Sequence, residues 1–174
     1  MLNQTTLDIA GFRDLLPPPA SRRRLIGIDL GTKTIGLALS DVTQMVASSL
    51  VTIRRTKFKA DAARLLHILD EHKIAGLVLG FPVNLDGREG PRAQATRAFA
   101  RNINALVDLP ILLWDERLTT AAAERMLIEA DTSRQRRGEL IDKLAATIIL
   151  QGALDRMRVA VIPSPPTPGG GGEG

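Results

Sequence analysis

Five short runs of apolar and β-branched residues place the strongest constraint on the fold of this 174-residue chain. The first three, at residues 25–30, 35–40 and 48–53, are separated by turn-length connectors, which predicts an antiparallel meander of strands. The last two, at residues 74–79 and 111–114, are continuous apolar runs, typical of strands covered on both faces. Together the runs indicate a mixed sheet with an antiparallel part and a parallel part.

Segments with helical spacing alternate with the later strands. We expect helices at residues 59–73, 91–107, 120–129 and 139–156, the second of them opened by a proline. The prediction is an α/β fold with a mixed five-stranded sheet, a three-strand antiparallel meander plus two parallel strands, flanked by helices.

The ends of the chain differ in composition from its middle. Residues 1–21 contain three consecutive prolines and no sustained periodicity, so we expect a flexible N-terminal extension. Residues 163–174 are rich in proline and glycine and can bury almost nothing apolar, which predicts a disordered tail. The folded domain is then expected at residues 22–162, a length suited to one core.

Composition excludes several classes of protein. The chain has no cysteine, which rules out disulfide scaffolds, thiolate metal sites and cysteine nucleophiles. Its most apolar late stretch, residues 144–154, is shorter than the roughly 20 residues that a membrane span needs. No secretory signal pattern opens the chain. We therefore expect a soluble, cytoplasmic protein without a membrane partner.

Asp29 lies in the most core-like strand, where an unpaired carboxylate would cost several kcal/mol to desolvate. One interpretation is a carboxylate at a strand end that accepts hydrogen bonds from the turn at residues 31–34. The other is a ligand for a cation. Asp115 and Glu116 follow the apolar run at residues 111–114, at the carboxyl edge where α/β sheets favour ligands. These two side chains should point to opposite faces, so only one can share the side of Asp29.

Asp142 lies in the last expected helix, beside its apolar face and off its polar stripe. A salt bridge with Lys33 or Arg117 would explain this position without any ligand. Three acids from separate segments would repel one another unless divalent cations neutralise them. Oxygen ligands suit Mg²⁺ or Mn²⁺, and two such ions would activate a water and stabilise the leaving oxygen in phosphodiester hydrolysis.

Four motifs together resemble the YqgF/RuvX family: GIDLGTKTIG at residues 27–36, GFPVNLDG at 80–87, DERLTT at 115–120 and DKLAA at 142–146. The resemblance implies the RNase H-like fold of that family. It also implies a nuclease that matures the 5′ end of pre-16S rRNA in ribosome biogenesis, or a Holliday junction resolvase. Carried over by motif, Asp29, Glu116 and Asp142 are the expected catalytic and metal-binding acids.

Cationic and polar side chains close to these motifs are candidates for contact with nucleic acid. The net charge of +4 permits a polyanionic partner without requiring one. The expected contact residues are Lys33, Asn84, Arg92, Arg134, Arg136 and Arg137. Because aromatic residues make up only 3% of the chain, recognition should depend on the sugar–phosphate backbone and on shape.

Structured RNA such as pre-rRNA and branched DNA are both compatible partners, and both a monomer and a homodimer fit the sequence. Two other classes of function stay open. A ribosome-assembly factor could keep the fold and bind RNA without cutting it. A nucleotide-binding phosphotransferase would use the turn after Asp29 as a phosphate loop, but about 140 core residues hold only half of such a protein.

Overall fold

The structure of the chain is a computed structural model that describes residues 5–118 and 134–159, and the side chains of residues 5–118 and 144–159. Its elements follow the order of the apolar runs. The strands are β1 (Thr5–Thr6), β2 (Arg24–Leu30), β3 (Thr34–Ser40), β4 (Ala47–Arg54), β5 (Ile74–Phe81) and β6 (Ile111–Asp115). The α-helices are α1 (Ile9–Leu15), α2 (Phe58–Glu71), α3 (Pro91–Asn104) and α5 (Arg134–Val159), with short 3-10 helices η1 (Pro19–Ser21) and η2 (Glu116–Leu118).

The strands form one mixed sheet in the order β1-β6-β5-β2-β3-β4. Strands β2, β3 and β4 are antiparallel neighbours, as the meander predicted. Strands β5 and β6 run parallel to β2, as expected for buried strands joined through helices. The α/β class and the mixed sheet are therefore confirmed, with one strand more than the five expected.

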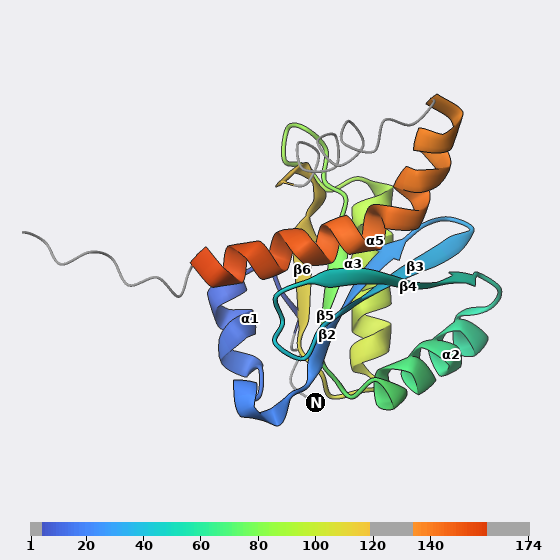
Figure 1. The fold of residues 1–174 in the computed structure, drawn as a ribbon. Coiled ribbons are helices and arrows are strands. Elements are labelled where there is room, and N and C mark those ends of the chain that lie inside the picture. The colour runs from blue at the N-terminus through green and yellow to red at the C-terminus, as the bar shows by residue number, and fades with distance from the viewer. Residues whose placement is uncertain (1–4, 119–133, 160–174) are drawn as a thin grey trace, which may run out of the picture.

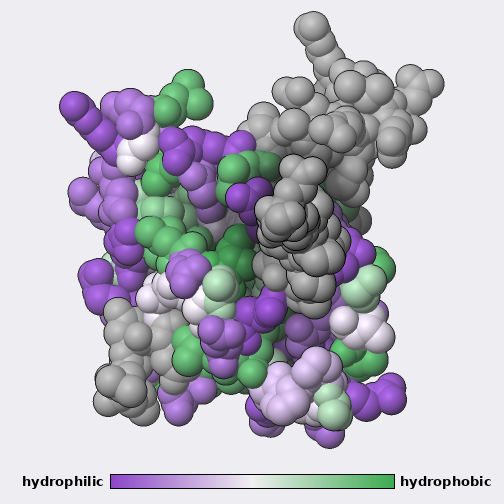
Figure 2. Space-filling model, turned by 90° about the vertical axis from the view of Figure 1, so that its left-hand side faces the viewer, coloured by the Kyte–Doolittle hydropathy of each residue, from purple (hydrophilic) through white to green (hydrophobic). Residues whose placement is uncertain are grey.

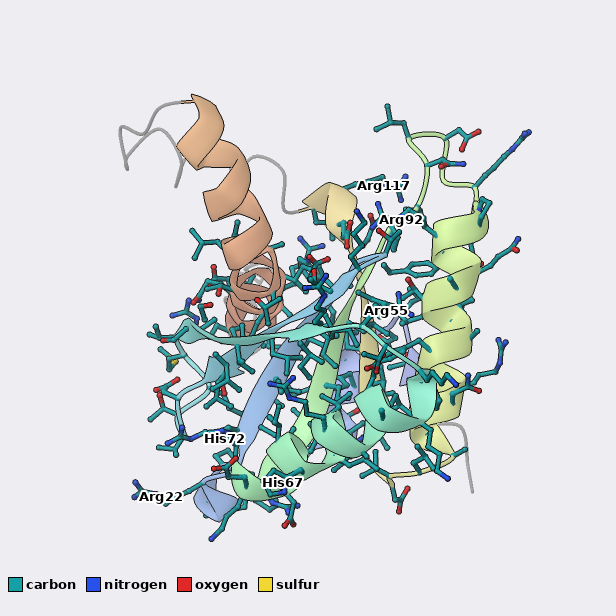
Figure 3. The ribbon with its side chains drawn as sticks, turned by 90° about the vertical axis from the view of Figure 1, so that its right-hand side faces the viewer. Arg22, Arg55, His67, His72, Arg92 and Arg117 are labelled. Carbon is teal, nitrogen blue, oxygen red and sulfur yellow. The ribbon has the colours of Figure 1, made fainter. Side chains whose placement is uncertain are left out.

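Helices cover both faces of the sheet. Residues of α2 and α3, including Leu65 and Phe99, share a core with one face, whereas Phe12 of α1 and Leu150 of α5 share a core with the other. Figure 1 shows α5 crossing the sheet, and Figure 3 shows α5 on one side of it with α2 and α3 on the other. Because both faces are covered, every residue of β5 is buried.

The N-terminal segment differs from the prediction of a flexible extension. Its Thr5 and Thr6 pair with β6 and add the sixth strand. Asp8 caps α1 by accepting hydrogen bonds from the backbone N–H groups of Ala10 and Gly11. Phe12 is fully buried. A two-residue strand and a seven-residue helix are too short to give a periodic signal, and for that reason the sequence did not reveal them.

The C-terminal half was only partly accessible to prediction. Helix α5 begins at Arg134, earlier than the expected residue 139, and ends at Val159. The helix expected at residues 120–129 and the tail expected at 163–174 lie outside the described residues.

On the face shown in Figure 2, hydrophilic residues surround hydrophobic residues gathered near the centre.

Candidate active site

The carboxyl ends of β2, β5 and β6 meet at one edge of the sheet, where ligands bind in α/β folds. Three connections leave the strands at this edge: the turn at residues 31–33, the loop at residues 82–90 and η2. The N-terminus of α3 begins directly after the loop. All candidate residues with described side chains lie on these connections, on the strand ends beside them or in the first turn of α3.

Asp29 faces α5. It is paired across the sheet with Gly36, and cross-strand partners share a face. A Cβ atom built on Gly36 would lie 3.7 Å from the Cβ of Asp29 and 3.7 Å from the Cβ of Ala146 in α5. The carboxylate of Asp29 is therefore on the side of the sheet that α5 covers.

Glu116 lies on the same face. Its Oε1 atom is 2.6 Å from the position that a Cβ on Gly80 would occupy, and Cδ1 of Ile149 in α5 is equally close to that position. Burial raises the pKa of Glu116 above its ordinary value, and the negative charge of Asp29 raises it further, while the positive charge of Arg92 opposes the shift. The structure thus brings Asp29 and Glu116 into electrostatic contact.

Asp115 is directed elsewhere, as the alternation of side chains predicted for neighbouring residues. It pairs with Arg117 through a bidentate contact, with Nη2 to Oδ2 at 2.6 Å and Nε to Oδ1 at 3.0 Å. The hydrogen bonds from Arg117 lower the pKa of Asp115 below its ordinary value. Of the two acids at the end of β6, Glu116 is the one whose pKa the charge of Asp29 affects.

Asp142 lies in α5, four residues before Ala146, whose Cβ faces Gly36. Four residues are about one helical turn. The side chain of Asp142 is outside the described part of the chain, as are those of Arg134, Arg136 and Arg137 in the first turn of α5. Their predicted roles stay predictions.

The other predicted contact residues lie on the rim of this edge. Lys33 is exposed in the turn between β2 and β3. Asn84 is exposed in the loop 82–90, where its backbone N–H donates to the carbonyl of Arg88 and its carbonyl accepts from Gly87. Arg92 is the second residue of α3 and acts on the pKa of Glu116. Figure 3 shows Arg92 and Arg117 at the same end of the molecule.

Two features of the rim could not be predicted from the sequence. Arg97 of α3 makes a bidentate contact with Glu89, with Nη2 to Oε1 at 2.5 Å, and its guanidinium lies 4.8 Å from the ring centroid of Phe81. Gly80 provides the space for Glu116. The contact partners of Arg97 are not set by helical or strand spacing, so no local pattern could have revealed them. The glycine was visible within its motif, but its role depends on a neighbouring strand.

The two carboxylates fit a divalent cation. Carboxylate oxygens are the ligands that Mg²⁺ and Mn²⁺ prefer. Burial first, and then the negative charge of Asp29, raise the pKa of Glu116, and a cation beside the two carboxylates would favour their ionised forms. Within residues 5–118 and 144–159, no group of three or more acidic or histidine side chains is assembled that could hold a metal ion. The side chain of Asp142, the third acid expected from the sequence, lies outside these ranges.

Comparison with known proteins identifies relatives along most of the chain. Residues 23–156 match the sequence profile of the RuvX family, described as a Holliday junction resolvase. A protein from Paracoccus denitrificans named "Putative pre-16S rRNA nuclease" is 59% identical over 151 residues, which is 87% of this chain and 94% of that protein. A protein of the same name from Bradyrhizobium sp. is 64% identical over 136 residues, covering 78% and 84% of the two chains.

The fold has a counterpart among solved structures. RuvC from T. thermophilus, solved in complex with a Holliday junction substrate, superposes with a TM-score of 0.51 over 80% of this chain and 97% of that chain, at 13% identity. This likeness confirms the RNase H-like fold. In the described part of the chain, no helix is both long and apolar enough to cross a membrane.

Proposed function

The chain belongs to the RuvX family, and from that premise we propose that it is a metal-dependent nuclease whose reacting centre is formed by Asp29, Glu116 and Asp142. The observation that carries this proposal is the electrostatic contact between Asp29 and Glu116 on the face covered by α5. Two carboxylates held together in a partly buried site are costly without a cation, so their juxtaposition favours metal-dependent chemistry over a purely structural role.

Asp29 and Glu116, with Asp142 as the third acid, would hold Mg²⁺ or Mn²⁺ through their carboxylate oxygens. When bound, a pair of such ions supplies an activated water and stabilises the charge on the leaving oxygen of a phosphodiester. The protein's own side chains set up this site. Gly80 leaves room for the Glu116 carboxylate, and Ile149 closes one side of it with an apolar group. Arg92 supplies positive charge that favours the ionised form of Glu116.

We further propose that the substrate is structured RNA, the 5′ end of pre-16S rRNA, and that the protein acts in ribosome biogenesis in the cytoplasm. The support is the name carried by the relatives that are 59% and 64% identical to this chain. Branched DNA is the second candidate, and it is supported by the description of the family as a Holliday junction resolvase. Both substrates present the same phosphodiester to the same acids.

The test is a cleavage assay of the full chain with Mg²⁺ or Mn²⁺ on two probes, a pre-16S leader RNA and a four-way DNA junction. We expect cleavage of the RNA, with loss of at least about 100-fold in rate for Asp29→Asn and for Glu116→Gln. Asp70→Asn is the matched control, because Asp70 is an exposed carboxylate on α2, away from this edge.

The outcomes separate the candidate functions. Preferential cleavage of the junction would replace RNA by branched DNA as the substrate. If both probes are bound tightly but neither is cut by the wild-type protein with either metal, the non-catalytic assembly factor is the correct function. Equal rates for Asp29→Asn and Asp70→Asn would remove Asp29 from the reacting centre.

A further inference from the structure

Where β3 begins and β4 ends, exposed polar side chains lie on the face of the sheet that carries Asp29. In the sheet register, Asp29 pairs with Gly36 and Gly36 pairs with Thr52, so these three residues lie in one row across three strands. Thr34 and Arg54 form the next pair on the same face. Thr34, Thr52 and Arg54 are all exposed.

The opposite face of the same strands confirms this orientation. Ile35 pairs with Ile53, and both are buried in the core shared with α2 and α3. Because side chains alternate along a strand, the residues on either side of Ile53 point away from that core. Arg54 is therefore directed to the side of the sheet where Asp29 and Glu116 lie.

This end of the sheet is held in place by Arg55. Its Nη1 atom donates to the carbonyl of Gly31 at 2.6 Å, and its backbone N–H donates to the carbonyl of Lys33 at 2.9 Å. Arg55 thus ties the end of β4 to the turn that directly follows Asp29 and Leu30. The position of Arg54 relative to the acids is set by strand pairing and by this tie.

The same end is positively charged. Lys33 precedes β3, and Lys57 is the residue before α2; both are exposed. Among the residues that the structure describes, no carboxylate forms an ion pair with Lys33, Arg54 or Lys57. The nearest acid in sequence, Asp61, is buried and accepts hydrogen bonds from Thr56. Its side chain is therefore committed to the start of α2.

We call this surface the hairpin platform; it consists of Thr34, Thr52 and Arg54 on the face that carries Asp29, together with Lys33 and Lys57 in the connections before β3 and after β4. We propose that the hairpin platform binds the sugar–phosphate backbone of the nucleic acid on the β4 side of the acids, an inference that rests on the nuclease function proposed above. Lysine, arginine and threonine side chains are the groups that contact phosphate oxygens without reading sequence. Their role would be to position the substrate arm.

The spacing suits a helical nucleic acid. Neighbouring strands lie about 4.8 Å apart and a strand rises about 3.3 Å per residue, so the Cα of Arg54 lies about 12 Å from that of Asp29. A B-form DNA arm rises about 3.4 Å per base pair, so on such an arm Arg54 would meet a phosphate about three to four pairs from the reacting one. Arg92 and Arg117 lie on the other flank, towards β5 and β6. The acids would then lie between two cationic flanks.

An arginine cluster elsewhere on the chain offers a matched comparison. Arg22 and Arg23 are exposed and precede β2, so they lie at the opposite end of the strand from Asp29. Figure 3 shows Arg22 far from Arg92 and Arg117. If any exposed pair of cations bound nucleic acid equally well, Arg22 and Arg23 would contribute as much to binding as Arg54 and Lys57.

The experiment measures binding of the full-length Asp29→Asn protein to a fluorescent RNA stem and to a four-way DNA junction across a series of salt concentrations. On this background, R54Q/K57Q is compared with R22Q/R23Q, since each pair removes two charges and keeps most of the side chain. For the DNA arms of the junction, each lost phosphate contact lowers the slope of log affinity against log salt by about 0.9, so R54Q/K57Q should lower it by about 1.8. The affinity should fall roughly 20-fold at 200 mM salt.

R22Q/R23Q should leave both the affinity and the salt slope unchanged. A salt slope for R54Q/K57Q equal to that of the Asp29→Asn parent would overturn the hairpin platform while leaving the nuclease site intact. Equal losses in the two double variants would also overturn it, because the charge effect would then be general. If the Asp29→Asn parent binds neither probe, the nuclease function and the platform both fail.

Discussion

The Oε1 atom of Glu116 lies 2.6 Å from the point where a Cβ on Gly80 would stand. Real Cβ atoms essentially never come this close to another atom, so a side chain at residue 80 would force the carboxylate to shift from the space that glycine leaves it. Ile149 of α5 enters the same space from the other side, with its Cδ1 also at 2.6 Å. One glycine in β5 therefore allows both the acid and the helix to approach the sheet.

Gly80→Ala should displace Glu116 and Ile149 together. We expect a loss of about 1–3 kcal/mol in the free energy of unfolding from overpacking, and a fall in cleavage rate beyond what the remaining folded fraction explains. Urea unfolding measures the change in the free energy of unfolding, and a cleavage assay without denaturant measures the change in rate. Gly36→Ala is the control for stability, because its added Cβ would meet nothing closer than 3.7 Å. Equal stability of the two variants would contradict the close approach at Gly80.

The raised pKa of Glu116 predicts how the free energy of unfolding depends on pH. A raised pKa in the folded state means that the folded protein holds this proton more tightly than the unfolded chain does. The free energy of unfolding should therefore fall as the pH rises from about 4.3, the ordinary value of a glutamate, through the raised pKa of Glu116. Glu116→Gln should remove this part of the pH dependence. Asp29→Asn should reduce it, because it removes a charge that raises the pKa of Glu116.

Urea unfolding at several pH values between about 4 and 7, without divalent cations, measures this dependence. Asp70→Asn again serves as the control, since Asp70 has no part in this site. If the difference between wild type and Glu116→Gln stays constant across the pH range, Glu116 does not titrate as the structure requires.

The sequence predicted the parts of the fold that leave a periodic or continuous apolar signal. The run at residues 74–79 is apolar because β5 is covered on both faces, so its burial could be predicted without any knowledge of its neighbours. The sequence also predicted that only one of the two acids at the end of β6 could share a face with Asp29, because side chains alternate along a strand. The choice of Glu116 over Asp115 came from family resemblance, and its physical reason became visible only in the contact of Asp115 with Arg117.

What the sequence could not predict depends on contacts between distant segments. Phe12 is buried against Gly76, and its Cζ atom lies 2.9 Å from the position that a Cβ on Gly76 would occupy. No sequence spacing links these two residues. Likewise, the contact of Arg97 with Phe81 and Glu89 joins a helix, a strand end and a loop. In each case an ordinary residue acquires its role from a partner that the local pattern does not specify.

Phe12 tests whether the N-terminal segment belongs to the folded domain. Phe12→Ala removes a fully buried ring from the core shared with α5, so we expect a loss of about 3–5 kcal/mol in the free energy of unfolding. Leu15→Ala, on the same helix but 51% exposed, should change it by less than about 0.5 kcal/mol. Urea unfolding measures both. Equal, small effects would show that α1 is not part of the cooperative unit.

Arg97 should hold the loop 82–90 in place at the rim of the candidate site. Its bidentate contact with Glu89 keeps the pKa of that carboxyl below its ordinary value, and its guanidinium lies over Phe81 at the end of β5. Arg97→Met should loosen the loop and speed trypsin cleavage after Arg88, whose side chain is 85% exposed. Arg101→Met, one turn further along α3 and exposed, is the control for the loss of one cation. Equal rates of cleavage after Arg88 in the two variants would show that the contact between Arg97 and Glu89 does not restrain the loop.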